Sequence, residues 1–299
     1  MNTKTAIITG ASSGLGLECA RALLRSDPSW HVVLAVRDRS RGSEAVKQLG
    51  EPQRCTVMQM DLASLASVRA FVEAVRDSGL APLHAIVCNA GVQVVSGTEW
   101  TDDGVEMTFG VNHLGHFALV QGLLGDLAQP ARIVVVSSGT HDPSKRTGMP
   151  SPRYTSAAEL AHPRAEQSAD DGRRGYTTSK LCNLLFAYEL DRRRGEGLTV
   201  NAFDPGLMPG SGLARDYPPL QRLAWRYLFP ALRVLPNVHS TRASGRYLAA
   251  LVNDARFEDL SGQYFEGRRP IRSSADSYDR DKARDLWETS ERLLTHATK

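Results

Sequence analysis

Short, almost continuously apolar runs alternate with amphipathic segments along most of this chain. The apolar runs are residues 5–9, 31–36, 55–60, 83–88 and 132–137. The segments of helical period between them are residues 14–26, 41–50, 65–78 and 112–128. Strands that helices cover on both faces have such continuous runs, whereas strands with one solvated face alternate apolar and polar residues. The pattern therefore predicts an α/β fold with a doubly wound parallel sheet.

The alternation stops between about 141 and 175, in a stretch rich in Pro, Ser, Arg and Asp. The pattern resumes afterwards, so we expect an insertion rather than a linker between domains. The resumed elements are a helix at 176–194, a strand at 198–203, a helix at about 239–252, a strand at 262–265 and a helix at about 280–294. All 299 residues are therefore predicted to form a single domain.

Charge and cysteine content exclude several classes of protein. Lys and Arg number 36, Asp and Glu number 33, and the charges are interleaved, so we expect no nucleic-acid partner. No stretch reaches the roughly 18 uncharged residues that a membrane-spanning helix needs. The four cysteines form no Cys-x-x-Cys pair. We expect reduced thiols in a cytoplasmic protein with no integral membrane span.

Three glycines, Gly10, Gly14 and Gly16, follow the first predicted strand and open the first predicted helix. Gly10 permits the sharp turn, Gly14 lets the backbone approach a pyrophosphate, and Gly16 lets the helix lie close to the sheet. The pyrophosphate then faces the helix N-terminus, which favours anions. We therefore expect a Rossmann-type dinucleotide site. Its expected binding residues in this loop are Gly10, Ser12, Ser13, Gly14, Leu15 and Gly16.

The residues after the second predicted strand bear on which dinucleotide binds. Arg37 comes first, and Asp38 follows it. An arginine here pairs with the 2′-phosphate of NADP, whereas an acid accepts from the 2′-hydroxyl of NAD. We expect NADP(H) with Arg37 at its phosphate; if Asp38 instead points at the ribose, NAD is the cofactor. Arg39 and Arg41 follow close behind. For these two arginines, a solvated charge cluster without a role in cofactor binding is the alternative.

Tyr176 and Lys180 stand four residues apart in a predicted helix, so both side chains share one face. A phenol has a pKa of about 10 and is a poor proton donor at neutral pH, but a nearby cation lowers that pKa. Lys180 supplies this cation. Ser138 follows the predicted strand 132–137, and its hydroxyl can hold a substrate oxygen at the carboxyl edge of the sheet, where such sheets bind ligands.

Six motifs resemble, in order, those of the short-chain dehydrogenase/reductase family, and the match covers nearly the whole chain. The motifs are Thr9–Gly16, Asn89-Ala-Gly91, Asn112, Ser138, Tyr176-x-x-x-Lys180 and Pro205-Gly206. The resemblance implies hydride transfer between NADP(H) and a carbonyl or alcohol carbon. It also implies that Tyr176 is the acid/base and that Ser138 anchors the carbonyl. Lys180 would bind the nicotinamide ribose as well as tune the phenol.

Further roles follow from the same resemblance. Asn112 is expected to hold a water that relays protons, which makes it the fourth catalytic residue. The remaining expected cofactor-binding residues are Asp61 and Leu62 after the third strand, Asn89 and Gly91 after the fourth, and Pro205 and Gly206 after the sixth. No metal is implied, because His113 and His116 have no third ligand with them.

Three segments are most similar to the branch of the family that contains retinol dehydrogenases and light-dependent protochlorophyllide reductases: residues 111–117, 179–183 and 286–294. Light-dependent reduction of a porphyrin double bond is therefore an alternative function. A cysteine usually follows the Pro-Gly pair in those reductases, and Leu207 stands there in this chain. A further alternative is a sensor or scaffold that binds NADP(H) without turnover, although such a protein would not need the intact catalytic set.

The segment from about 207 to 235 is expected to be a lid over the substrate. Within it, Leu220–Leu235 is rich in aromatic and aliphatic residues and can roof a pocket for a bulky hydrophobic carbonyl or alcohol. Packing against the body and a peripheral membrane contact are the alternatives. Most family members have a threonine where Gly210 stands, and Ser211 is its expected substitute. The insertion at 141–175 would cover helices that pair subunits in shorter members, so we expect a monomer.

Overall fold

The computed structural model describes residues 3–95, 97–164, 168–208 and 238–296. Its strands are β1 (Lys4–Thr9), β2 (Trp30–Val36), β3 (Cys55–Gln59), β4 (Leu83–Cys88), β5 (Leu127–Val136), β6 (Leu198–Asp204), β7 (Tyr264–Glu266) and β8 (Arg269–Ile271). They form one sheet in the order β3-β2-β1-β4-β5-β6-β7-β8, parallel except for the antiparallel pair β7 and β8. The strand order reverses beside β1, and the carboxyl ends of β1 and β4 border the crevice in which such sheets bind ligands.

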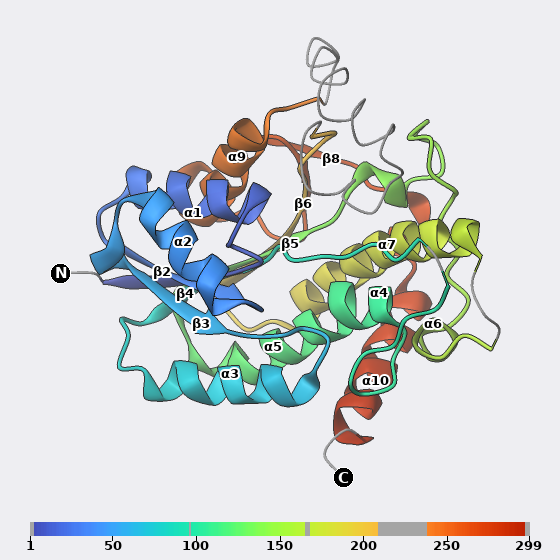
Figure 1. The fold of residues 1–299 in the computed structure, drawn as a ribbon. Helices are drawn as coiled ribbons and strands as arrows, with labels where there is room; N and C mark the ends of the chain where they lie inside the picture. Colours follow the sequence, from blue (N-terminus) through green and yellow to red (C-terminus); the bar gives the residue numbers. More distant parts are fainter. Residues whose placement is uncertain (1–2, 96, 165–167, 209–237, 297–299) are drawn as a thin grey trace, which may run out of the picture.

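Helices cover both faces of this sheet (Figure 1). One face carries α1 (Gly14–Ser26), α2 (Arg39–Leu49) and α9 (Thr241–Asn253). The other carries α3 (Leu65–Asp77), α5 (Gly115–Leu123) and α7 (Ala169–Arg193), with α4 (Met107–Phe109) and α10 (Arg280–His296) beside α7. Neighbouring strand residues go to opposite faces: Ile7 belongs to the apolar cluster of Phe71 in α3, and Ile8 to that of Leu23 in α1. The doubly wound α/β fold is confirmed.

Helix α7 begins at Ala169 rather than at the predicted Tyr176. A capping box starts it: the Ser168 hydroxyl accepts a hydrogen bond from the Asp171 amide, and the Asp171 carboxylate accepts one from the Ser168 amide. The first turns contain two glycines and several charged residues, so they show no apolar period in the sequence. The predicted insertion at 141–175 therefore includes the start of α7 and the short helix α6 (Ala157–Ala161).

The helix predicted at 112–128 is also displaced. It starts with α4, passes through a π-helical turn at Gly110–Leu114 and ends with α5. Strand β5 starts at Leu127, before the predicted strand at 132–137. The sequence does not reveal this start, because the first four residues of β5 are exposed or half-buried and lack the continuous apolar run of a covered strand. No sequence pattern marks β8, since it has three residues and one of them is Pro270.

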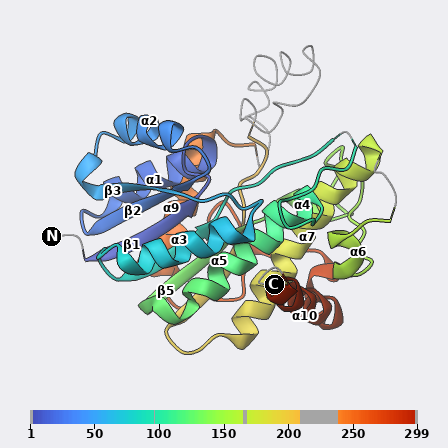
Figure 2. The same ribbon diagram turned by 60° about the horizontal axis from the view of Figure 1, so that its bottom comes forward.

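The insertion is attached to the body of the protein through α10. The Asp285 carboxylate accepts hydrogen bonds from the Tyr154 hydroxyl at 2.7 Å and from the Ala157 amide at 2.8 Å. Helices α6, α7 and α10 lie side by side in both views (Figures 1 and 2). Among the described helices, none is long and apolar enough to cross a bilayer.

Candidate active site

The loop between β1 and α1 has the backbone that its glycines predict. Gly10 and Gly14 have φ angles of 65° and 59°, which glycine adopts without strain. A Cβ on Gly16 would lie 2.7 Å from the Gly10 carbonyl oxygen and 2.6 Å from Asn89 Nδ2, so a side chain there would push α1 away. A Cβ on Gly14 would meet nothing within 4 Å, and Ser13 makes no side-chain cap at the helix start. The N-terminus of α1 therefore fits an anion such as a pyrophosphate.

Thr9 joins the ends of β1 and β4. Its hydroxyl oxygen accepts hydrogen bonds from the amides of Asn89 and of the next residue, both at 2.9 Å, and its carbonyl accepts from Asn89 Nδ2 at 2.7 Å. Asn89 is thus fixed beside the glycine loop. A Cβ on Gly91 would lie 3.2 Å from Asn112 Oδ1 and 3.6 Å from Lys180 Nζ, so the chain after β4 passes close to the predicted catalytic residues.

The two histidines of the 111–117 segment have core partners. His116 Nδ1 donates to the Asn112 carbonyl at 3.2 Å, so its Nε2 is an acceptor and faces the Thr9 hydroxyl at 2.9 Å. Burial lowers the pKa of His116 to about 4. His113 Nε2 is hydrogen-bonded to Ser290 Oγ at 2.8 Å, and burial lowers the pKa of His113 to about 3. In the described part of the chain, no three His, Cys, Asp or Glu side chains gather as metal ligands.

Arg37 and Asp38 follow β2 and have different environments. Asp38 accepts hydrogen bonds from the amides of Ser40 at 2.8 Å and Arg41 at 3.2 Å, and so caps α2. The Ser40 hydroxyl and these amides hold the pKa of Asp38 below its ordinary value. Arg37 is exposed at the carboxyl edge of the sheet. Asp38 is therefore engaged with its own helix, whereas Arg37 lies open to a ligand.

The other predicted cofactor residues lie at the carboxyl ends of β3 and β6. Asp61 Oδ1 accepts a hydrogen bond at 2.9 Å from the amide two residues further on, and Leu62 is buried. Gly206 has a φ of 72°, and the Pro205 carbonyl accepts from the Ser244 hydroxyl of α9 at 2.7 Å. These contacts fix both turns at the edge of the sheet that carries the glycine loop.

Tyr176 and Lys180 lie one turn apart on α7, and only 6% and 4% of their surfaces are exposed. Lys180 Nζ lies 5.4 Å from the centroid of the Tyr176 ring and donates a hydrogen bond to the Val136 carbonyl at 3.4 Å. Burial lowers the pKa of Lys180 to about 8, and the negative charge of Asp204 opposes that fall. The structure thus brings the cation next to the phenol.

The end of β5 is tied to the same turn of α7. Ser137 Oγ donates to the Lys180 carbonyl at 2.7 Å. Ser138 comes next and starts the 3-10 turn Gly139–His141, where its half-buried hydroxyl accepts from an amide of that turn at 3.3 Å. Ser138 therefore stands beside the turn of α7 that carries Lys180.

Asn112 lies in the π-helical turn between α4 and α5 and is fully buried. Its Oδ1 accepts from the Val92 amide at 2.8 Å, and its Nδ2 donates to the Val92 carbonyl and to Ser179 Oγ, both at 2.9 Å. Such turns are frequent at functional sites. Asn112 thus joins the segment after β4 to α7, and its role in a proton relay stays a prediction.

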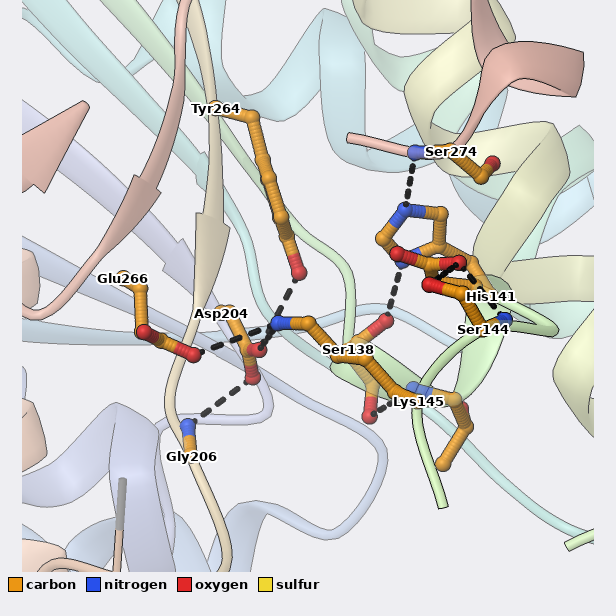
Figure 3. A network of polar contacts seen from close by, with 11 residues as sticks. Ser138, His141, Ser144, Lys145, Asp204, Gly206, Tyr264, Glu266 and Ser274 are labelled. Atoms are coloured by element: carbon orange, nitrogen blue, oxygen red, sulfur yellow. Dashed lines mark hydrogen bonds and ion pairs between the residues drawn. The ribbon is translucent and has the colours of Figure 1, made fainter. Parts of the chain in front are cut away.

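Two further residues at this edge are absent from the sequence-based site. His141 Nδ1 donates to the Ser138 carbonyl at 2.6 Å, and its Nε2 accepts from the Ser274 amide at 3.1 Å (Figure 3). Asp204 ends β6 and is 2% exposed. A charged residue at the end of an apolar strand, directly before Pro205-Gly206, is the signal that could have pointed to it. No comparable signal marks His141, because the Ser274 amide that binds its Nε2 is 133 positions away.

Part of the predicted site lies outside the described residues. This applies to Gly210, Ser211, Leu220–Leu235 and most of the predicted lid at 207–235. The described chain stops at Met208 and resumes at Val238, which pairs with Leu207 in a β-bridge. The two ends of that segment are therefore held together beside the Pro-Gly turn.

Comparison with known proteins decides the family. Residues 4–155 match the family model for short chain dehydrogenases. A protochlorophyllide reductase from Avena sativa is 38% identical over an alignment of 316 positions, which covers 96% of this chain and 98% of that protein. The chain belongs to the short-chain dehydrogenase family. It is an oxidoreductase, as the motif order predicts.

Two solved structures share the fold of this chain. An uncharacterised protein from Mycobacterium Paratuberculosis has a TM-score of 0.73 at 30% identity, covering 98% of this chain and 94% of that one. A variant of the actinorhodin polyketide ketoreductase with NADPH has a TM-score of 0.65 at 20% identity, covering 90% of this chain and 99% of that one. The second likeness concerns the fold alone.

Proposed function

We propose that this oxidoreductase transfers a hydride between NADP(H) and the carbonyl or alcohol carbon of a bulky hydrophobic small molecule. The buried pair of Tyr176 and Lys180, tied to the strand end that bears Ser138, carries this proposal. The glycine loop and the α1 N-terminus without a side-chain cap fit a dinucleotide pyrophosphate. When bound, NADP(H) supplies the hydride in reduction and accepts it in oxidation.

Tyr176 exchanges a proton with the substrate oxygen in this mechanism. In reduction, its phenol donates the proton as the carbonyl oxygen gains negative charge. The Lys180 ammonium stabilises the phenolate that remains, because a nearby cation favours the anionic form. The Ser138 hydroxyl donates a hydrogen bond to the same substrate oxygen and fixes its position. A water held at Asn112, together with Lys180, returns a proton to Tyr176.

The assignment of NADP(H) rather than NAD(H) rests on the environments of Arg37 and Asp38. Asp38 caps α2, so its carboxylate is directed at helix amides instead of a ribose. Arg37 is exposed, and a guanidinium can bind a 2′-phosphate in bidentate fashion.

Light-dependent reduction of protochlorophyllide is the second candidate, because a protochlorophyllide reductase is 38% identical to this chain. The residue after the Pro-Gly pair weighs against it. A cysteine is usual there in such reductases, whereas this chain has Leu207 with 41% of its surface exposed. A leucine cannot donate a proton as a cysteine can. Its exposed apolar side chain instead suits contact with a hydrophobic substrate.

A screen of NADPH consumption in the dark separates the candidates. Wild-type protein and Tyr176→Phe are incubated with a panel of bulky ketones and aldehydes, and a parallel sample receives protochlorophyllide under illumination. We expect dark turnover of at least one carbonyl compound, reduced about 100-fold or more in the variant. Turnover in the light sample alone would instead support the photochemical reaction. A variant as fast as wild type would exclude Tyr176 as the proton donor.

We also propose that the protein is a monomer, because α10 covers α7 on its outer side. The Arg193 guanidinium lies 4.6 Å from the centroid of the Trp287 ring, and Trp287 packs against Phe117 at 5.0 Å. Helix α6 then packs on α10. Light scattering after gel filtration should give 32.7 kDa, the mass of one chain. Twice that mass would contradict the proposal.

A further inference from the structure

A buried histidine closes the turn that begins at Ser138. His141 is the last residue of this 3-10 turn, and its side chain is fully buried. Its backbone amide and its Nδ1 both donate hydrogen bonds to the Ser138 carbonyl, at 3.1 Å and 2.6 Å. A carbonyl oxygen only accepts, so Nδ1 carries a proton. One end of the imidazole is therefore bonded directly to the backbone of Ser138.

The other end of the same ring is bonded to a distant part of the chain. His141 Nε2 accepts a hydrogen bond from the Ser274 amide at 3.1 Å (Figure 3). An amide N–H only donates, so Nε2 carries no proton and the ring is a neutral imidazole. Burial lowers the pKa of His141, which favours the same neutral form. His141 thus links the Ser138 turn to a residue 133 positions away.

The segment that holds the far end of His141 is attached to α7. Ser274 precedes a 3-10 turn, and its carbonyl accepts from the amide and the hydroxyl of Ser277 at 3.1 Å and 2.6 Å. Tyr278 ends that turn and stacks on Tyr188 of α7, with the ring centroids 5.2 Å apart. The helix that carries the predicted catalytic pair therefore also supports the residue that binds His141.

Tyr264 of β7 contacts the imidazole from another side. The two rings meet edge to face, with centroids 5.1 Å apart and an angle of 83° between their planes. The Tyr264 hydroxyl donates to Asp204 Oδ2 at 3.1 Å, and Asp204 Oδ1 accepts from the Gly206 amide at 2.9 Å (Figure 3). The orientation of His141 is therefore fixed by two hydrogen bonds and by a ring that is itself bonded near the Pro-Gly turn.

Ser138 needs such support, because its hydroxyl is held weakly. The hydroxyl oxygen accepts only a long hydrogen bond, of 3.3 Å, from the Thr140 amide. The chain before Ser138 is fixed by Ser137, whose hydroxyl donates to a carbonyl of α7 at 2.7 Å. The chain after Ser138 is fixed by His141. The backbone on both sides therefore decides where the Ser138 hydroxyl points.

We propose that His141 is a positioning residue for the reaction, which acts through Ser138 by tying the turn that carries its hydroxyl to Ser274. This role rests on the proposed function of Ser138. Without the link, the hydroxyl would take orientations in which it does not meet the substrate oxygen, and the transition state would lose a hydrogen bond.

The test removes one amide hydrogen and leaves the histidine in place. Ser274→Pro has no backbone N–H, and the φ of −60° at Ser274 is an angle that proline adopts. Ser274→Ala is the matched control, because it keeps the amide. Both variants lose the Ser274 hydroxyl, which has no hydrogen-bond partner among the described residues.

The readout is the reduction by NADPH of a bulky ketone from the dark screen. In Ser274→Pro, kcat should fall about tenfold, whereas KM and the NADPH Kd should stay unchanged, because the lost hydrogen bond is one that strengthens in the transition state. Ser274→Ala should match wild type. Equal kcat values in Ser274→Pro and Ser274→Ala would overturn the role.

A second variant keeps the test decisive if Ser274→Pro does not fold. His141→Gln lacks the Nδ1 donor, while its amide oxygen can still accept from the Ser274 amide, and the same fall in kcat is expected. Its control is His84→Gln. His84 Nδ1 also binds a carbonyl, that of Pro130 at 2.8 Å, but it lies near the amino end of β4. A fall in His84→Gln equal to that in His141→Gln would overturn the role.

A merely structural role is separated by a variant that lacks the hydroxyl. When Ser274→Pro is added to Ser138→Ala, the residual kcat should fall no further, because the group that His141 positions is already absent. A tenfold fall in this background as well would show that the link does not act through Ser138. If Ser138→Ala alone is as fast as wild type, the proposed function of Ser138 is wrong. If Ser138→Ala is slow and Ser274→Pro is fast, only the role of His141 is wrong.

Nitrogen NMR tests the link without substrate. The chain has eight histidines, and in protein with ¹⁵N-labelled histidine the His141 signals are those that His141→Gln removes. At neutral pH, the spectrum should show a proton on Nδ1 and none on Nε2 of His141. A proton on Nε2 would exclude the bond from the Ser274 amide and overturn the role, whatever the kinetics show.

Discussion

The two halves of the carboxyl edge are held together by different forces. Around β1 and β4, neutral groups in close contact fix the chain: the Thr9 hydroxyl binds two amides, and Gly16 lies against a carbonyl and an amide nitrogen. Around β5 to β8, the contacts involve charges, with Lys145 between Asp204 and Glu266. The cofactor side should therefore respond to changes of shape, and the substrate side to changes of charge.

The largest effect is expected from a single methyl group on the cofactor side. In Gly16→Ala the new Cβ would overlap the Gly10 carbonyl and the Asn89 amide. Overpacking of this kind costs about 1–3 kcal/mol, so the NADPH Kd should rise about 5- to 150-fold. Gly125→Ala is the control, because a Cβ there meets nothing within 4 Å. Fluorescence titration gives both constants, and equal Kd values would show that close packing does not shape this side.

Arg37→Asp tests the charge that we assign to the 2′-phosphate of the cofactor. Loss of a charge-assisted contact of about 1.5–3 kcal/mol should weaken NADPH binding about 10- to 100-fold. NADH binding should be unchanged or tighter, because NADH has no 2′-phosphate. Arg269→Asp, an exposed arginine of β8, should leave both constants unchanged. Unaltered NADPH affinity in Arg37→Asp would remove Arg37 from the site.

A smaller effect is expected from Lys145→Met on the substrate side. Partly exposed ion pairs contribute about 1 kcal/mol or less, so kcat/KM for a ketone should fall no more than about fivefold. The fall should appear mainly in KM, because the insertion loses its contact with Glu266 and Asp204 beside Ser138. The NADPH Kd should not change. A change in that Kd, with steady-state kinetics unaffected, would contradict the division into two sides.

The two halves of the carboxyl edge also differ in how much of each the sequence predicts. The glycine loop, Arg37 and the pair of Tyr176 and Lys180 follow from spacing along one strand or helix, and the structure places each on the expected element. Lys145 and Glu266 are 121 positions apart, and no local pattern connects them. Residues of this kind become visible only when the strands and turns are assembled.

Element boundaries show a similar limit. The first turns of α7 have no apolar period, because they depend on the capping box of Ser168 and Asp171 rather than on burial. The π-helical turn that holds Asn112 likewise has no marker in the hydrophobic pattern. Strand cores were predictable because burial on both faces dictates their composition.

The pH dependence of kcat/KM tests most directly whether the Lys180 charge makes the Tyr176 phenol a working proton donor. Since the pKa of Lys180 is about 8, the ammonium dominates below that pH and the neutral amine above it. Carbonyl reduction by the wild type should therefore be constant near neutral pH and decline above about pH 8. In Lys180→Met the residual rate should show no such decline. The same alkaline decline in the variant would contradict the account.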